Sequence, residues 1–246
     1  MDPSIVLADR PYSLADIRTQ GRLDFRKVGE RAWSDLTTHC QAKELRLYDL
    51  LTSSLDGIDR LRHTTMLEIV WANKVRDLAP LFRMEWLERL VLSDFPRLGS
   101  LDGIESLKYL HELDLSGNCG SLDPPLRLAS LKPLGKLRKL TSLSIFNVRL
   151  QDNDISFIAS AFPDLRSFYI WNANYEFAHL AFLAGRLNSQ LEKPIEPGQR
   201  LNVPCSKCGG ALYRFAGYRM PTLCEACDKA RFRNLTAEFA RLGGLQ

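Results

Sequence analysis

The chain has 246 residues, of which 45% are hydrophobic and 25% are charged, and its formal net charge is +4. These fractions are typical of a soluble globular protein, and no run approaches the about 18 consecutive apolar residues of a membrane-spanning helix. The first 18 residues carry early acidic side chains and no long apolar core, so we do not expect a secretory signal there. We therefore expect a cytoplasmic protein that does not bind membranes. Secretion of a bacterial effector by a nonclassical route stays open as the alternative.

Seven pairs of large apolar residues, with one residue between the two members, recur along the chain at a near-regular spacing. The pairs are Leu23/Phe25, Leu45/Leu47, Leu67/Ile69, Leu90/Leu92, Leu113/Leu115, Leu143/Ile145 and Phe168/Ile170. Their first members are spaced 22, 22, 23, 23, 30 and 25 residues apart. This period predicts a stacked solenoid, in which each unit is a short strand plus a return segment that cannot bury its apolar side alone. An ordinary amphipathic strand is the alternative for any one pair.

The fifth unit carries the pattern L-x-x-L-x-L-x-x-N in full, from Leu110 to Asn118. Its apolar positions are expected to point inward, and its Asn amide can bond backbone groups where the chain turns away from the sheet. Phe95 and Val148 replace Asn in neighbouring units, so the Asn ladder is imperfect. Residues 101–110 and 131–140 resemble the return segments of internalin-like, short-period leucine-rich repeats, and the resemblance covers about residues 40 to 175. It implies an α/β solenoid with parallel strands on the concave face and 3₁₀ turns on the convex face.

Four segments follow from this pattern. Residues 1–40 hold only the strand core of a repeat, so we expect an N-terminal cap and a first irregular repeat, because open solenoid ends must be covered. Residues 41–187 are predicted to be leucine-rich repeats. Residues 188–204 are rich in proline and polar side chains and are predicted to be a linker, and residues 205–246 a zinc-binding module.

Side chains alternate between the two faces of a strand, so the residues before, between and after each apolar pair should line the concave face. These residues carry mixed charge in the first half of the predicted face and are aromatic at its end. An exposed aromatic cluster is typical of a protein-binding hot spot. We predict a protein partner on the concave face, contacted by Tyr48, Glu68, Arg89, Glu112, Asp114, Phe146, Tyr169 and Trp171. Coverage of the aromatic residues by the C-terminal module is the alternative left open.

Four of the six cysteines, Cys205, Cys208, Cys224 and Cys227, form the pattern C-x2-C-x15-C-x2-C. Two such pairs can place four thiolates around a tetrahedral Zn²⁺ ion, and Gly209 and Gly210 can supply the positive φ that the turn beneath the metal needs. A site whose four ligands are all cysteine leaves no position for water, so we expect a structural zinc ion. Disulfides are the competing interpretation. Cys40 and Cys119 lie alone in the repeat region.

The order of elements predicted for the zinc-binding module is knuckle, hairpin, second knuckle and helix. Residues 211–221 are predicted to be a hairpin that turns near Gly217, and Phe232, Leu235, Phe239 and Leu242 mark one face of a helix that ends near Gly243. This order resembles treble-clef zinc fingers, and the Cys-x-x-Cys-Gly start also resembles a zinc ribbon.

All of the net charge lies on the zinc-binding module. Residues 205–246 hold seven Lys or Arg residues and three acids, whereas the rest of the chain has 26 bases and 26 acids. Basic and aromatic residues interleaved in this way can hold phosphates and stack on bases. The candidate nucleic-acid contacts are Arg214, Arg219, Lys229, Arg231 and Arg233. The alternative is that the aromatic residues form the small core of the module while the basic residues are solvated.

No catalytic pattern is present in the sequence: the four histidines are scattered, and neither H-E-x-x-H, G-x-S-x-G nor a phosphate-binding glycine loop occurs. We therefore expect a bacterial, non-enzymatic interaction protein with no small-molecule substrate. A nucleic-acid-associated regulatory protein that binds through the basic zinc-binding module is the alternative function.

Overall fold

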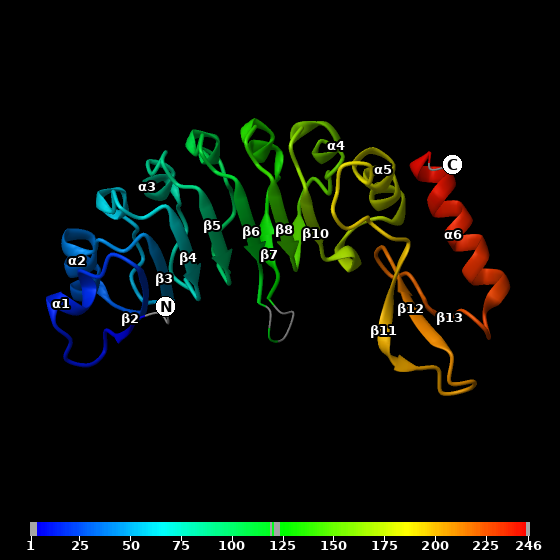
Figure 1. Cartoon of the computed structure of the whole chain (residues 1–246), viewed down its shortest axis with the longest axis horizontal. Helices are drawn as coiled ribbons and strands as arrows, with labels where there is room; N and C mark the ends of the chain where they lie inside the picture. The colour runs from blue at the N-terminus through cyan, green and yellow to red at the C-terminus, as the bar shows by residue number, and fades with distance from the viewer. Residues whose placement is uncertain (1–3, 119, 121–123, 245–246) are drawn as a thin grey trace.

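The computed structural model describes residues 4–118, 120 and 124–244, and it has the shape of an arc with a small module at one end (Figure 1). An eight-stranded parallel sheet runs along the arc in the order β1-β2-β3-β4-β5-β6-β8-β10. Its strands are β1 (Ser4–Leu7), β2 (Arg22–Val28), β3 (Glu44–Leu50), β4 (Met66–Val70), β5 (Arg89–Ser93), β6 (Glu112–Ser116), β8 (Ser142–Phe146) and β10 (Ser167–Ile170). No helix among these residues is both long enough and apolar enough to cross a bilayer.

The predicted register is confirmed. Leu45, Leu67, Leu90 and Leu113 are direct partners in adjacent parallel rungs, and the pairing continues to Leu143 and Phe168. The paired apolar residues of β2 to β8 are all at most 2% exposed and form one continuous core. The fold is therefore the leucine-rich-repeat solenoid that the repeat period predicts.

The turns after the strands are stabilised without a ladder of stacked Asn side chains. The residue two positions beyond most apolar pairs has a positive φ between 52° and 61°; these residues are Lys27, Asp49, Trp71, Asp94 and Asn147. At the next position, where the pattern places Asn, Val28, Leu50 and Phe95 are at most 1% exposed. Backbone bonds between rungs satisfy the turn instead, as from Leu50 N–H to Trp71 C=O at 2.9 Å. Stacked apolar side chains thus replace the expected amides.

Short return segments cover the outer side of the arc (Figure 1). They are α1 (Leu14–Ile17), α2 (Glu30–His39), η1 (Ile58–Arg60), α3 (Ala79–Phe82), η2 (Ile104–Ser106), η3 (Lys132–Lys136) and α4 (Ile158–Ala161), where η marks a 3₁₀ helix. The prediction of 3₁₀ turns is confirmed for residues 101–110 and 131–140, which contain η2 and η3. Among these seven segments, α2 alone is a full helix of ten residues, and it lies within the segment expected to be a cap.

The 30-residue spacing in the middle of the solenoid arises from an insertion that adds a second, two-stranded sheet. Strand β7 (Leu126–Leu128) pairs in parallel with β9 (Val148–Leu150). Gly117 starts this detour, where an added Cβ would lie 2.5 Å from Leu126 N and 2.6 Å from Asn147 O, so any side chain would clash with the backbone. Cys119 lies outside the described residues.

After β10 come η4 (Asn172–Asn174) and α5 (Phe177–Leu187), and then the C-terminal module. The module consists of β11 (Gly198–Pro204), β12 (Ala211–Phe215), β13 (Thr222–Cys224) and α6 (Lys229–Gly243). The predicted hairpin and helix are confirmed, with Gly217 at φ +110° in the turn. The predicted linker is shorter than expected, because residues 198–204 pair antiparallel with β12 as a strand of the module.

Candidate functional site

The C-terminal module packs against the last helix of the solenoid. The rings of Phe177 on α5 and Phe239 on α6 are 5.3 Å apart, and Tyr218 N–H donates to Tyr175 C=O at 2.7 Å. Gly185 permits the close approach of the two helices, since an added Cβ would lie only 1.7 Å from Gly243 O. The module therefore covers the end of the solenoid through α5 and α6.

The aromatic residues at the end of the concave face form the cluster that their strand positions predict. Phe146 stacks with Tyr169 at a centroid distance of 6.4 Å and an interplanar angle of 14°, and it lies 5.2 Å from the ring of Trp171. Tyr169 is 48% exposed, so the module does not cover it. We refer to Phe146, Tyr169 and Trp171 as the aromatic cluster.

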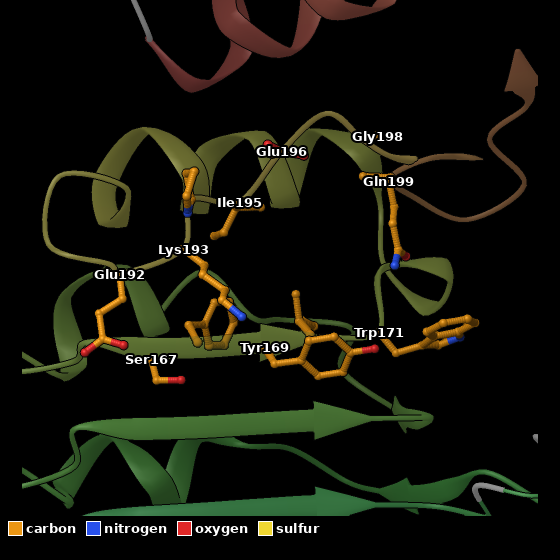
Figure 2. A pocket seen from close by; sticks show the side chains of 13 residues that line it. Ser167, Tyr169, Trp171, Glu192, Lys193, Ile195, Glu196, Gly198 and Gln199 are labelled. Atoms are coloured by element: carbon orange, nitrogen blue, oxygen red, sulfur yellow. The ribbon is translucent and has the colours of Figure 1, made fainter. Parts of the chain in front are cut away.

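A pocket of about 430 Å³ adjoins the aromatic cluster, between β10 and the segment that follows α5. Figure 2 shows Tyr169 on β10 and Trp171 just beyond its end, with Lys193 and Gln199 extending toward them from that segment. Residues 167–171 line one side of the pocket, and the opposite side is lined by residues 192–196, Gly198, Gln199 and Ala216. The module thus supplies part of the pocket wall.

The first half of the concave face is a ladder of ion pairs. Asp24 accepts two bonds from Arg26, at 2.6 and 2.9 Å, and one from Arg46 at 3.3 Å. Arg46 also donates to Glu68 at 2.9 Å, and farther along the face Arg89 pairs with Glu112 at 3.2 Å. Asp24 is only 3% exposed. Burial acts to raise the pKa of Asp24, but Arg26 and Arg46 outweigh it and hold the pKa below its usual value.

Asp114 occupies the same middle position of its strand without a comparable clamp. Burial raises the pKa of its carboxyl group, and a hydrogen bond from Ser144 and the charge of Arg89 only partly oppose this shift. The charged residues predicted to contact a partner therefore lie on one face, where Arg89 and Glu112 pair with each other and Glu68 pairs with Arg46.

One aromatic residue of this face was not predicted. Trp71 lies at the turn after β4, is 43% exposed, and has its ring 5.4 Å from that of Tyr48. The guanidinium groups of Arg26 and Arg46 lie 5.5 and 5.1 Å from the centroid of Tyr48. Trp71 belongs to the positive-φ turn position rather than to the strand, so the alternation rule did not include it.

The four cysteines of the C-terminal module converge on one point, with their sulfur atoms all within 4.8 Å of one another. Sγ–Sγ distances are 4.0 Å for Cys205 and Cys227 and 3.4 Å for Cys208 and Cys224. Tetrahedral coordination at a Zn–S distance of 2.3 Å needs sulfurs about 3.8 Å apart. The knuckle geometry also fits, since Gly210 N–H donates to Cys208 Sγ at 3.4 Å and Gly209 has φ +72°.

The electrostatics of the cysteine cluster also favour a cation at its centre. Backbone N–H groups of Lys207 and Cys208 lower the pKa of Cys205 to about 7. Hydrogen bonds with the Cys208 and Cys224 sulfurs, by contrast, raise the pKa of Cys227 to about 12. Four thiolates at these distances repel each other unless a positive ion lies between them. The group can hold a metal ion. Cys40 is buried on its own, and burial raises the pKa of its thiol.

The five basic residues considered for nucleic-acid binding, Arg214, Arg219, Lys229, Arg231 and Arg233, are all exposed, and none forms an ion pair within the described residues. Of the interleaved aromatic residues, Tyr213 and Phe215 pack edge-on against Phe232, at 5.1 and 5.3 Å. They form the core of the module and do not present their faces for base stacking. Tyr218 alone of the three is exposed, with Arg219 over its ring.

The fold is similar to that of solved internalins from Listeria monocytogenes. An internalin (inlF) is 21% identical, with a TM-score of 0.50, over 67% of this chain and 44% of that chain. Internalin C2 is 20% identical, with a TM-score of 0.46, over 64% of this chain and 63% of that chain. The chain thus spans less than two thirds of either internalin, and the similarity shows the fold alone. No protein-family profile and no curated protein matches the sequence.

Proposed function

We propose that this is a cytoplasmic, non-enzymatic bacterial protein whose concave face binds a partner protein, with the aromatic cluster at the centre of the contact. The observation that supports this proposal is the 48% exposure of Tyr169 within a cluster of three rings that adjoins a pocket. Aromatic side chains bury a large area at low entropic cost and are enriched at binding hot spots. The charged half of the face would supply the polar rim.

The four-cysteine group is proposed to hold a structural Zn²⁺ ion, ligated by Cys205, Cys208, Cys224 and Cys227. With four thiolate ligands the ion would have no open position for a substrate. Its task would be to keep β12, β13 and α6 together, because a module with so few buried residues needs a staple. Through α5 and α6 the module would then protect the end of the solenoid and hold one wall of the pocket.

The partner-binding proposal is tested by substitution of Tyr169. Partners are captured from bacterial lysate on the immobilised full chain and identified, and the affinity of the strongest one is then measured with purified protein. Tyr169→Ala should weaken binding at least about tenfold, as expected for a hot-spot residue. The matched control is Tyr109→Ala, which removes a tyrosine that is 53% exposed and lies outside the concave strands. Equal affinities for both variants would refute the proposed contact.

Binding of nucleic acid by the C-terminal module is the second candidate, and it is supported by the five exposed basic residues that lack ion pairs. Such binding would depend steeply on salt, because each neutralised phosphate releases counterions. A double variant, Arg231→Glu with Arg233→Glu, should abolish a gel shift seen at low salt while leaving partner capture intact. If no shift occurs at low salt with single- or double-stranded DNA or RNA, this function is excluded.

A further inference from the structure

Strand β10 is the last strand of the sheet, and its outer edge has no strand partner among the described residues. On the inner side, Ser167 N–H donates to Thr141 C=O at 3.0 Å and Trp171 N–H to Ile145 C=O at 2.8 Å. Because backbone groups alternate in direction along a parallel strand, the N–H and C=O groups of Phe168 and Ile170 point outward. No described residue bonds these four groups. They are two N–H donors and two C=O acceptors, spaced along the edge as in a parallel sheet.

The chain begins another rung beside this edge and then leaves it. Glu192 N–H donates to Arg166 C=O at 2.9 Å, which repeats the bond that opens the preceding rung, from Arg166 N–H to Thr141 C=O at 2.8 Å. Two residues later comes Pro194, whose ring fixes its own φ and restricts the backbone of the residue before it.

The side chain of Asn188 completes this diversion. It accepts from Ile195 N–H at 2.8 Å and donates to Ile195 C=O at 3.1 Å. The N–H and C=O groups of Ile195, which would continue the ladder on β10, are thus bonded to Asn188 instead. The segment that carries Ile195 forms the far wall of the pocket. The segment after Glu192 is therefore held away from β10 and does not pair with it.

The burial of β10 shows that a rung is missing. Its inward residues Phe168 and Ile170 are only half-buried, whereas the equivalent Leu143 and Ile145 of β8 are 1% and 0% exposed. The space next to them is the pocket of about 430 Å³, whose far wall includes Ile195 and the buried Ala216. The volume lies within the range of pockets that bind ligands. The gap is therefore bordered by outward backbone groups and by apolar side chains, as the position of a further strand would be.

We propose that this gap accepts an extended segment of a partner protein as an added strand of the sheet. The inference rests on the proposed function, since the segment would lie beside Tyr169. The four outward backbone groups would pair with the main chain of the segment. Two of its apolar side chains, at positions i and i+2, would cover Phe168 and Ile170, and the side chain between them would emerge on the concave face next to the aromatic cluster. The expected ligand is thus a proline-free stretch with apolar residues at alternate positions.

Amide hydrogen exchange of the free full chain tests the edge itself. The amides of Phe168 and Ile170 should exchange at least about tenfold faster than those of Leu143 and Ile145 on β8, a strand that pairs with β6 on one side and β10 on the other. Slow exchange at Phe168 and Ile170 would mean that the edge is already closed, and it would overturn the proposal.

Selection of peptides tests whether an extended segment fills the gap beside β10. Random heptamers displayed on phage are selected on the full chain, and the enriched sequences should alternate apolar and polar residues. A selected peptide should protect the Phe168 and Ile170 amides from exchange. N-methylation of its bonding amides should lower the affinity at least about tenfold, because it removes the main-chain donors.

Ile170→Lys should abolish binding of the selected peptide by placing an ammonium group in the apolar gap. Ile5→Lys, at a 57% exposed isoleucine on the opposite edge strand β1, is the matched control, and thermal unfolding checks that both variants fold. Peptides that bind both variants equally and tolerate N-methylation would overturn the added strand. The concave-face function would still stand if Tyr169→Ala released the partner. Self-association of the chain that Ile170→Lys abolishes would make a second copy the occupant and would likewise overturn the proposal.

Discussion

The two halves of the concave face share one strand register but differ in what their side chains contact. On β2 to β4, charged residues pair with each other across neighbouring strands, and Asp24 is buried beneath Arg26 and Arg46. At β8 and β10, the rings of the aromatic cluster pack against one another and leave Tyr169 48% exposed. A partner that binds the first half must replace bonds that already exist. A partner that binds the second half gains by removing apolar surface from water.

From this difference we infer separate tasks for the two halves under the proposed function. The ion-pair ladder contributes to the stability of the solenoid, because its members satisfy one another over strands that are about 22 residues apart in the chain. We expect the aromatic cluster, in which Tyr169 is about half exposed, to contribute less to stability and to offer contact area. Substitutions should therefore separate stability from binding: the first half should affect unfolding, and the second half should affect affinity.

Metal removal should have the largest effect, and it should act on the second half alone. Chelation is expected to unfold the C-terminal module, since structural zinc sites supply most of the folding free energy of such small units. The wall formed by Gly198, Gln199 and Ala216 would then be lost, and partner affinity should fall at least about tenfold. Elemental analysis should find one zinc ion per chain before chelation, and circular dichroism should show loss of the helical signal of α6.

Two variants control for this experiment. Cys224→Ser should reproduce the effect of the chelator, and Cys40→Ser should keep the zinc, because Cys40 lies in the repeat region away from the cluster. Amide protection in β2 to β4 should be unchanged. A module that stays folded without metal would show that its own packing suffices.

Asp24→Ala should have the next largest effect, and on stability rather than binding. It leaves Arg26 and Arg46 without the carboxylate that both contact. Removal of one partner from a buried ion pair costs about 3–5 kcal/mol, and the partial exposure of both arginines reduces this to about 2 kcal/mol. Urea unfolding measures the change, with Tyr169→Ala as the comparison, for which we expect less than about 0.5 kcal/mol. A reversed order of the two values would contradict the division of tasks.

The sequence was sufficient to predict the repeats because apolar pairs at a fixed period leave few other folds. Seven of the eight strands of the main sheet follow from those pairs. Strand β1 was missed, because Val6 is its single buried residue and its apolar residues Ile5 and Leu7 fall outside the repeat period. The early boundary of the module was missed because β11 is mostly exposed and is defined by backbone pairing with β12.

The candidate site was less predictable than the fold. Alternation placed Phe146, Tyr169 and Trp171 on one face, but it could not show which charged residues pair with one another, because that choice depends on side-chain conformations across neighbouring strands. The open edge of β10 had one signal in the sequence, Pro194 just after the start of an eighth repeat unit. The two hydrogen bonds between Asn188 and Ile195 depend on how the chain leaves α5, and no sequence pattern predicts them.

Asp24 and Asp114, each in the middle of its strand, should affect stability in opposite ways as the pH falls. The pKa of Asp24 is lowered by Arg26 and Arg46, so its stabilising contribution is present above the unfolded value of about 3.9 and is lost as the pH falls through the folded value. The pKa of Asp114 is raised by burial, so its contribution is present below about 3.9 and is lost as the pH rises through the folded value.

Unfolding measured from pH 7 to pH 3 separates the two groups. Asp24→Asn should destabilise the chain at pH 7, and Asp114→Asn should stabilise it, because the asparagine carries no buried charge. Both differences from the wild type should shrink toward pH 3, where the carboxyl groups become protonated. The same sign for both variants at pH 7 would show that Arg89 clamps Asp114 as strongly as Arg46 clamps Asp24.

Glu112→Ala should have the smallest effect and gives the strictest comparison of the two halves. Glu112 and Arg89 are about half exposed, and exposed pairs contribute about 0–1 kcal/mol, so we expect less than about 0.5 kcal/mol in urea unfolding. Both residues were predicted to contact the partner, together with Tyr169 and Trp171. If they lie only at the rim, Glu112→Ala should alter the salt dependence of association and leave the dissociation rate unchanged. A loss of affinity as large as that of Trp171→Ala would move the centre of the contact to the charged half.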